Sequence, residues 1–510
     1  MIERVEPYRI VILGGGTAGW MTAAMLASRL NAEDYRITVV ESEQIGTVGV
    51  GEATLPHIKQ FNDALGIDEA GFVAATQATF KLGIEFVDWR APGHRYIHPF
   101  GAFGEPWRGV EFQHHWLRLR AQGRAVEPLS AYSCAVVAAE NRKFEHPSKD
   151  PQSVRSTFAY AYHFDAGLYA AFLSRWTQDR GVARVEGVVE QVNRDAESGE
   201  VVGLRLQSGE TVRGDLFVDC SGFRSLLLGE TLGVDWRDWS AWLPCDRALA
   251  APSARAEDFT PFTRSTAQTA GWTWRIPLQH RTGNGYVYSS HFCDEAEAEA
   301  TLLAAIGDIP LASPRPLRFQ AGRRAKAWVG NCAAIGLAGG FLEPLESTSI
   351  FLIQAAAHDL AALMPTRGST RVDPRLSDEF NRLFEIHYER ARDFLILHYV
   401  ANRREGEPLW DYVRHMDLPD SLRRHIAGFE ARGALPTYQL GLFSRDSWLA
   451  VMAGQGLAPR AYDPLADAVE TDEIDRRLKD FSQRISSEVA TMSAHAAFVT
   501  AFGVQAGAGR

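Results

Sequence analysis

Near its N-terminus the chain reads RIVILGGGTAG, from Arg9 to Gly19. The residues before the glycines predict a buried strand, and the apolar spacing from Trp20 to Leu30 predicts a helix. Gly14 permits a tight turn, Gly16 lets the backbone approach a pyrophosphate, and Gly19 lets helix and strand pack closely. The stretch therefore predicts the start of a βαβ unit that binds a dinucleotide.

A second predicted strand, Ile37 to Val40, ends on Glu41, which lies 22 residues after Gly19. A carboxylate at this position can accept hydrogen bonds from ribose hydroxyls. The alternative is a glycine-rich turn that binds no ligand. We expect the cofactor to be bound by Gly14, Gly16, Thr17, Ala18, Gly19 and Glu41.

Two later segments favour FAD over NAD. The predicted strand 216–219 ends in a small-residue turn at 220–222, and the segment 331–336 precedes another glycine pair at 339–340. FAD enzymes of the glutathione-reductase-like class place such turns against the flavin. The chain has no second good G-x-G-x-x-G and so no evident nicotinamide site. We therefore expect the flavin to arrive already reduced.

Composition excludes several classes of protein. The chain is 46% apolar and 23% charged, which is typical of a globular enzyme, and its net charge of −10 argues against nucleic acid as a partner. The five cysteines are odd in number and form no C-x-x-C pair, which predicts free thiols rather than disulfides or a metal site. We expect no membrane span, no secretion leader and a cytoplasmic location.

The remaining pattern predicts one interleaved α/β unit rather than separate domains. Alternating residues at 185–218 predict a β-meander, the stretch 272–291 predicts strands with a turn at 283–285, and helical spacing recurs at 347–364, 377–401 and 472–497. We expect an FAD-binding module of the glutathione-reductase-like, flavin monooxygenase type, with an added and mainly helical substrate-binding part. The module would comprise about 1–90, 150–240 and 320–365, and the substrate-binding part about 91–150, 241–319 and 366–510.

Lys81 and Glu346 carry charge next to apolar surroundings. Lys81 stands in the segment TFKLG, and Glu346 stands in EPLEST just before a long apolar helical run. A charge beside apolar groups is unfavourable unless it is paired or used in function. Lys81 could instead extend its side chain to solvent, and Glu346 could interact with a helix dipole.

Five segments together resemble the flavin-dependent halogenases, best known from the tryptophan halogenases. They are Gly14 to Gly19, GEAT at 51–54, Lys81, WTWRIP at 272–277, and EST at 346–348. The resemblance implies that reduced FAD, oxygen and chloride or bromide give hypohalous acid, and that a separate flavin reductase supplies the reduced FAD. It also implies that Gly51, Ala53, Gly336 and Ser347 contribute to the FAD site.

The resemblance gives the two charged residues catalytic roles. Lys81 would hold or activate the oxidant, as a hydrogen-bond donor or as a transient haloamine. Glu346 would stabilise the cationic ring intermediate or remove its proton. Trp272 and Trp274 would form a wall that keeps the organic substrate from the flavin, although plain core packing explains them as well.

The resemblance also indicates a halide site. Ser347 stands at a plausible helix N-cap, so the backbone amides of Thr348 and Ser349 would point outward at the positive end of a helix. The family usually has glycine where this chain has Ser349. We expect the extra side chain to alter the preference between chloride and bromide.

The expected substrate is a small aromatic molecule. His98 and Phe100 resemble a ring-stacking segment of tryptophan halogenases, and Trp448 is expected to join them. The segment from Tyr438 to Phe443 lacks the tyrosine pair that grips free tryptophan in those enzymes. We therefore expect an indole other than free tryptophan, and a homodimer is left open.

Two other functions fit the same flavin signature. An aromatic hydroxylase would bring its substrate directly to the flavin and would not need Lys81 or the tryptophan pair. A non-enzymatic flavin redox protein would show no dependence on halide and would form no covalent product.

Overall fold

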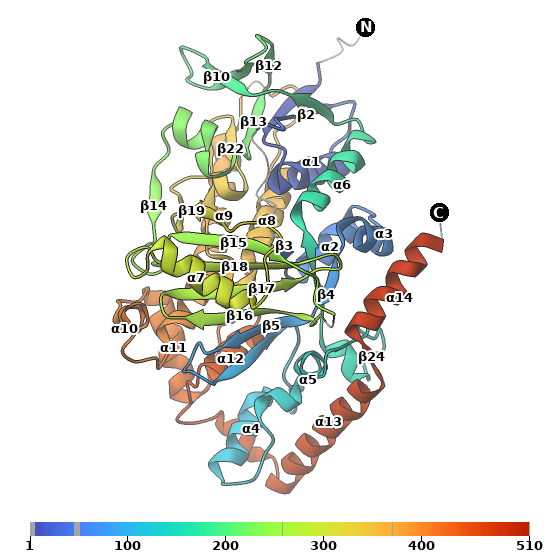
Figure 1. The fold of residues 1–510 in the computed structure, drawn as a ribbon, viewed down its shortest axis with the longest axis vertical. Coiled ribbons are helices and arrows are strands. Elements are labelled where there is room, and N and C mark those ends of the chain that lie inside the picture. The colour runs from blue at the N-terminus through green and yellow to red at the C-terminus, as the bar shows by residue number, and fades with distance from the viewer. Residues whose placement is uncertain (1–5, 45–50, 258, 370, 509–510) are drawn as a thin grey trace.

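The computed structural model describes residues 6–44, 51–257, 259–369 and 371–508. One end of the molecule is a six-stranded sheet in the order β21-β22-β13-β1-β2-β9, all parallel except the edge strand β21 (Figure 1). These strands come from four separate parts of the sequence. They are β1 (Tyr8–Leu13), β2 (Tyr35–Glu41), β9 (Ala183–Glu186), β13 (Leu216–Asp219), β21 (Trp328–Val329) and β22 (Cys332–Ala334).

The predicted βαβ start is confirmed. Helix α1 (Thr17–Arg29) follows β1 directly, and β2 pairs in parallel with β1. Helix α6 (Ala166–Gln178) and helix α8 (Thr348–Ala362) pack on α1. All five cysteines are free, as predicted.

The middle of the molecule is a seven-stranded sheet that spans the width of Figure 1. Its order is β19-β15-β18-β17-β16-β5-β6, and only the β16–β5 pair is parallel. Strand β17 carries the WTWRIP segment. The strands are β5 (Gly83–Val87), β6 (Arg95–Pro99), β15 (Arg247–Ser253), β16 (Phe262–Gln268), β17 (Gly271–Pro277), β18 (Thr282–Tyr288) and β19 (Arg315–Arg318).

A small three-stranded sheet joins the two larger ones. Its order is β3 (Gly51–Ala53), β8 (Ala161–Asp165) and β4 (Thr79–Lys81). Because β8 pairs with both neighbours, it brings the GEAT segment and Lys81 to the same region.

Helices cover the other end of the molecule. The long helix α9 (Pro374–Val400) packs against α8 and against α12 (Arg445–Gly454). The helix predicted at 472–497 is wrong in its extent, since it is divided into α13 (Thr471–Thr491) and α14 (His495–Ala508) by the two-residue strand β24 (Ser493–Ala494). Within the described ranges, no helix has the length and apolar character needed to cross a bilayer.

Two strand predictions had different outcomes. The β-meander predicted at 185–218 is confirmed for 189–213, by the antiparallel sheet of β10 (Val189–Arg194), β11 (Val201–Leu206) and β12 (Thr211–Arg213). The turn predicted at 283–285 is wrong, because these residues lie inside β18. Gly285 faces the Trp274 ring so closely that an added Cβ would lie 2.0 Å from it, which explains the glycine without a turn.

Candidate active site

The glycine-rich stretch forms a cradle at the start of α1. Gly14 has a φ of +115°, and an added Cβ there would lie 2.3 Å from the Cys220 carbonyl oxygen. A Cβ at Gly19 would lie 1.8 Å from the Gly14 carbonyl oxygen. A Cβ at Gly16 would have no atom of the described residues within 4 Å. Packing therefore requires Gly14 and Gly19, whereas the open space at Gly16 fits a ligand that approaches the backbone.

Beside this cradle lies a cavity of about 390 Å³ between α1 and α6. Glu41 lines it, accepts a hydrogen bond of 3.3 Å from Trp20 Nε1, and forms an ion pair with Arg184. A carboxylate fixed in this way is available to ribose hydroxyls, so the donor and acceptor set fits the nucleotide part of FAD. Sequence reasoning missed Arg184, which stands on β9, far from the motif in sequence.

The other expected cofactor residues fall into two groups. Thr17 and Ala18 are the first residues of α1, and Gly336 approaches them, since a Cβ at Gly336 would lie 2.8 Å from that of Ala18. Gly51 and Ala53 are buried on β3, where Gly51 faces Ile276 and Leu278 at the end of β17.

Lys81 is fully buried at the end of β4. Its Nζ donates hydrogen bonds to Ser347 Oγ (2.8 Å) and to the Thr54 carbonyl oxygen (3.0 Å), and lies 5.1 Å from the centre of the Phe100 ring. Burial lowers the pKa of Lys81 to about 7, against an opposing effect of the Glu346 carboxylate. Because Lys81 is fully buried, its side chain does not extend to solvent.

A chain of hydrogen bonds fixes the strand that carries Lys81. Thr79 Oγ1 donates to the Pro277 carbonyl oxygen (2.7 Å) and lies 3.0 Å from His163 Nδ1. His163 Nε2 lies 3.0 Å from Thr263 Oγ1. Burial lowers the pKa of His163 well below its usual range, so this ring is a neutral structural link between β4, β8, β16 and β17.

Glu346 is fully buried between two imidazoles. Its Oε2 lies 2.8 Å from His98 Nδ1, and its Oε1 lies 2.8 Å from His398 Nε2. Burial by itself would raise the pKa of Glu346, but His98 and His398 outweigh it and hold the pKa at about 2. Sequence reasoning missed His398, which lies on α9 and shows no motif.

Ser347 stands at the N-cap position of α8, as predicted, but its side chain does not cap the helix. Ser347 precedes α8 with a φ of +58°, its side chain makes no capping hydrogen bond, and its Oγ accepts from Lys81 instead. Thr348 and Ser349 do begin α8, as expected. Thr348 Oγ1 is buried, with no hydrogen-bond partner among the described residues.

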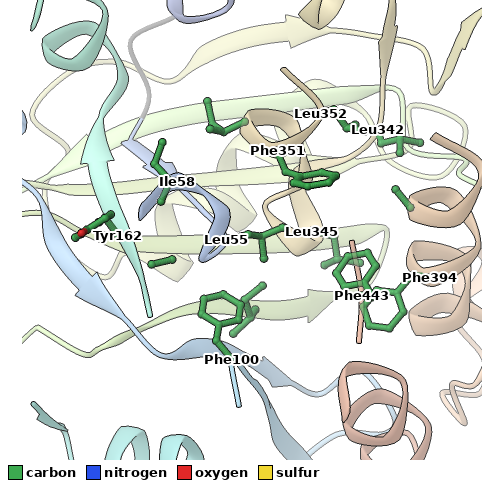
Figure 2. Close-up of a cluster of buried hydrophobic side chains, with 14 of the residues drawn as sticks. Leu55, Ile58, Phe100, Tyr162, Leu342, Leu345, Phe351, Leu352, Phe394 and Phe443 are labelled. Carbon is green, nitrogen blue, oxygen red and sulfur yellow. The ribbon is translucent and has the colours of Figure 1, made fainter. Parts of the chain in front are cut away.

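Three buried aromatic rings near Lys81 and Glu346, those of Phe100, Phe394 and Phe443, belong to the hydrophobic cluster drawn in Figure 2. Phe394 of α9 stacks on Phe443 with ring centres 3.7 Å apart, and His98 lies 5.5 Å from Phe394. Phe100, two residues after His98 in sequence, is in the same cluster. Trp448 is fully buried and packs edge-on against Phe394, with ring centres 5.1 Å apart.

The tryptophan pair on β17 is anchored by a buried carboxylate. Trp272 and Trp274 lie on the same side of the strand, with ring centres 6.2 Å apart. Trp272 Nε1 donates to Glu343 Oε2 (3.0 Å), which also accepts from the Tyr399 hydroxyl. Burial raises the pKa of Glu343 to about 7, although both hydrogen bonds lower it. The segment 343–346 thus carries two buried carboxylates, held by consecutive residues of α9.

Several known proteins are similar to this chain in sequence. Residues 9–471 match the family model described as tryptophan halogenase. The tryptophan 6-halogenase ThaL of Streptomyces albogriseolus is 36% identical over 487 residues, which cover 88% of this chain and 90% of ThaL. The tryptophan 7-halogenase RebH of Lentzea aerocolonigenes is 35% identical, covering 92% of this chain and 95% of RebH.

Two solved structures match this chain along almost its whole length. BrvH, a flavin-dependent halogenase from Brevundimonas sp. BAL3, has a TM-score of 0.92 and 45% identity, covering 98% of this chain and 99% of BrvH. Xcc4156, a flavin-dependent halogenase from Xanthomonas campestris, has a TM-score of 0.93 and 44% identity, covering the same shares. These neighbours confirm the predicted fold class. The chain belongs to the tryptophan halogenase family of flavin-dependent halogenases.

Proposed function

We propose that this enzyme uses reduced FAD, oxygen and chloride or bromide to make hypohalous acid, and transfers the halogen to an electron-rich aromatic ring such as an indole. The observation that carries the proposal is the fully buried Lys81, which contacts an aromatic ring and is linked through Ser347 to the segment of Glu346. A lysine of this kind has little structural purpose, because burying its charge is unfavourable.

The cofactor would be held by the cradle at Gly14, Gly16 and Gly19 and by Glu41. When bound, reduced FAD would supply the two electrons that bring oxygen to the peroxide level, at which it can oxidise halide to hypohalous acid. The tryptophan pair on β17 would exclude the organic substrate from the flavin, so that only a small oxidant passes. Trp272 suits this role because Glu343 fixes the ring.

Lys81 is placed to receive that oxidant. With a pKa lowered to about 7 by burial, its side chain is present as both ammonium and amine at neutral pH. The ammonium can donate a hydrogen bond to hypohalous acid. The amine can instead attack the halogen, which forms an N–halogen bond, breaks the O–halogen bond and releases water once the amine proton is transferred.

The halide would bind at the start of α8. The backbone amides of Thr348 and Ser349 lie at the positive end of a 15-residue helix. The buried Thr348 hydroxyl supports this assignment, because it has no partner among the described residues and can donate to an anion.

The substrate would lie among His98, Phe100, Phe394 and Phe443. This wall is apolar and aromatic, and the segment 438–443 has no tyrosine pair for an amino-acid group. Two of the relatives named above, ThaL and RebH, are tryptophan halogenases, so a related ring is expected. We propose an indole without the amino-acid group, and a separate flavin reductase as the source of reduced FAD.

The decisive experiment compares Lys81→Ala with wild type on indole and on tryptophan, with a flavin reductase, oxygen and each halide. We expect halogenated indole from wild type, a slower reaction with tryptophan, and oxygen consumption without product in Lys81→Ala. A hydroxylase would keep its activity in Lys81→Ala and would need no halide, so that result refutes the proposal. A preference for tryptophan would refute only the substrate assignment.

A further inference from the structure

The Glu346 carboxylate is occupied by its two histidine neighbours. His98 Nδ1 lies 2.8 Å from Oε2 and 3.1 Å from Oε1, and His398 Nε2 lies 2.8 Å from Oε1. A carboxylate with an imidazole on each side is stabilised in its ionised form and is a weak base. Glu346 is therefore poorly suited to take a proton from a substrate.

His398 is committed to this arrangement through both ring nitrogens. Its Nδ1 donates to the Phe394 carbonyl oxygen at 2.9 Å, which can only accept. Its Nε2 lies 2.8 Å from Glu346 Oε1 as a buried ion-pair contact, without the geometry of a hydrogen bond. His398 and Glu346 thus form a close buried pair, with the carboxylate directly against His398 Nε2.

His98 differs, because it contacts the carboxylate through Nδ1 rather than Nε2. Nδ1 faces the carboxylate and carries the proton of that hydrogen bond. In the neutral ring this leaves a lone pair on Nε2. The Nε2 atom is buried and has no hydrogen-bond partner within the described part of the chain.

The surroundings of this nitrogen are apolar rings. The centres of the Phe100, Phe394 and Phe443 rings lie 6.3, 5.5 and 6.1 Å from that of His98. A buried polar atom without a hydrogen-bond partner is unfavourable. A ligand that supplies a proton in this aromatic cluster would remove that penalty.

We propose that His98 Nε2 is the catalytic base that takes the proton from the halogenated ring carbon, and that Glu346 orients and stabilises His98. The proposal rests on the function proposed above. It reverses the expectation that Glu346 removes the proton, and it gives Glu346 the role that a carboxylate has beside a catalytic histidine in other enzymes.

Bonds and protons balance in this step. The ring carbon attacks the halogen, so the C–halogen bond forms while the O–halogen or N–halogen bond breaks. The same carbon then carries both hydrogen and halogen. Its C–H bond breaks, the electron pair returns to the ring, and the proton moves to His98 Nε2. The imidazolium keeps its Nδ1–H bond to Glu346, which offsets the new charge.

The test uses His98→Asn and an indole deuterated at every ring carbon. The Asn amide can still donate to Glu346 near the place of Nδ1, but it offers no base in place of Nε2. His115→Asn is the matched control, because His115 is a buried histidine whose Nε2 is already engaged with the Trp107 carbonyl oxygen. Initial rates with protonated and deuterated indole are measured in parallel for all three proteins.

We expect no isotope effect in wild type or His115→Asn, where loss of the proton is fast. In His98→Asn we expect the rate to fall on the order of 10²-fold, and deuterated indole to react more slowly than protonated indole. A slower variant without an isotope effect would mean that His98 only positions the ring, and the proposal would be wrong. An unchanged rate would also overturn it.

N-methylindole distinguishes a base at Nε2 from a hydrogen-bond acceptor. If Nε2 serves instead to accept the indole N–H, wild type should fail on N-methylindole, and that result would overturn the proposal. We expect N-methylindole to react in wild type and to show the same isotope effect in His98→Asn. If wild type forms no haloindole at all, the proposed function itself is wrong. That outcome differs from one in which wild type halogenates indole and only the role of His98 is refuted.

Discussion

Replacing Lys81 by methionine tests whether the buried amine has a pKa near 7. The substitution keeps the length and apolar stem of the side chain but removes the titrating group. Ser347 and the Thr54 carbonyl lose a donor, which changes stability by an amount that does not depend on pH. The informative quantity is therefore the pH dependence of the difference between variant and wild type.

The magnitude follows from the shift in pKa. Burial lowers the pKa of Lys81 from 10.5 to about 7, and one pKa unit corresponds to about 1.4 kcal/mol. Below pH 7 the side chain is protonated in both folded and unfolded wild type, so the difference is constant. Between pH 7 and 10.5 the unfolded chain binds the extra proton, so the free energy of unfolding of wild type rises with pH relative to Lys81→Met, by about 5 kcal/mol in total.

Thermal unfolding can detect this change. With an unfolding entropy of about 2.1 cal/mol/K per residue, a chain of this length shifts its Tm by ~1 °C per kcal/mol. We expect the Tm of wild type minus that of Lys81→Met to be flat from pH 6 to 7 and then to rise by ~1.4 °C per pH unit. The exposed Lys149→Met is the control and should show no such trend.

A difference that stays constant up to pH 10 would refute a lowered pKa at Lys81. The same protein should consume oxygen but form no halogenated indole, since no amine remains to hold the oxidant. Halogenation by Lys81→Met at the wild-type rate would contradict any direct role of this side chain.

Three further predictions concern the cofactor, the halide and the carboxylate. Gly16→Ala should leave the Tm of the FAD-free protein unchanged but weaken FAD binding, because its Cβ meets no atom of the described residues. Gly19→Ala should lower both the Tm and the affinity for FAD, and calorimetry and FAD titration distinguish the two variants. Ser349→Gly should change the chloride-to-bromide product ratio in a competition assay, and an unchanged ratio would remove Ser349 from the halide site. Glu346→Gln should lower the halogenation rate by a similar factor at pH 6 and pH 8, because a carboxyl with a pKa of about 2 is ionised at both, and a loss seen only at pH 8 would contradict this.

The nucleotide-binding end could be predicted from the sequence because its signals are local. The turn after β1, the glycines and Glu41 stand within about 35 residues and follow from backbone geometry alone. The segment 283–285 shows the limit of such signals. Its glycines favour a turn when only neighbours in sequence are considered, but close packing of Trp274 on β18 requires them, and that contact depends on strand pairing.

The partners of Glu346 could not be predicted for a different reason. His98 stands 248 positions away in the sequence, and His398 lies in the middle of an apolar helical pattern. Nothing in the local sequence of α9 distinguishes a histidine that binds a carboxylate from one that is simply buried. The spacing of Phe394 and His398 by four residues places both on one face of the helix, and this is the one available signal.

The end of α9 couples the two halves of the proposed reaction. His398 contacts Glu346 beside the aromatic cluster, and the next residue, Tyr399, donates to Glu343, which anchors Trp272. Because consecutive residues of one helix hold both carboxylates, a shift of this helix end would move the wall that excludes substrate and the pair that orients His98 together. The two buried carboxylates would thereby fix the distance between the proposed passage for the oxidant and the proposed base at His98.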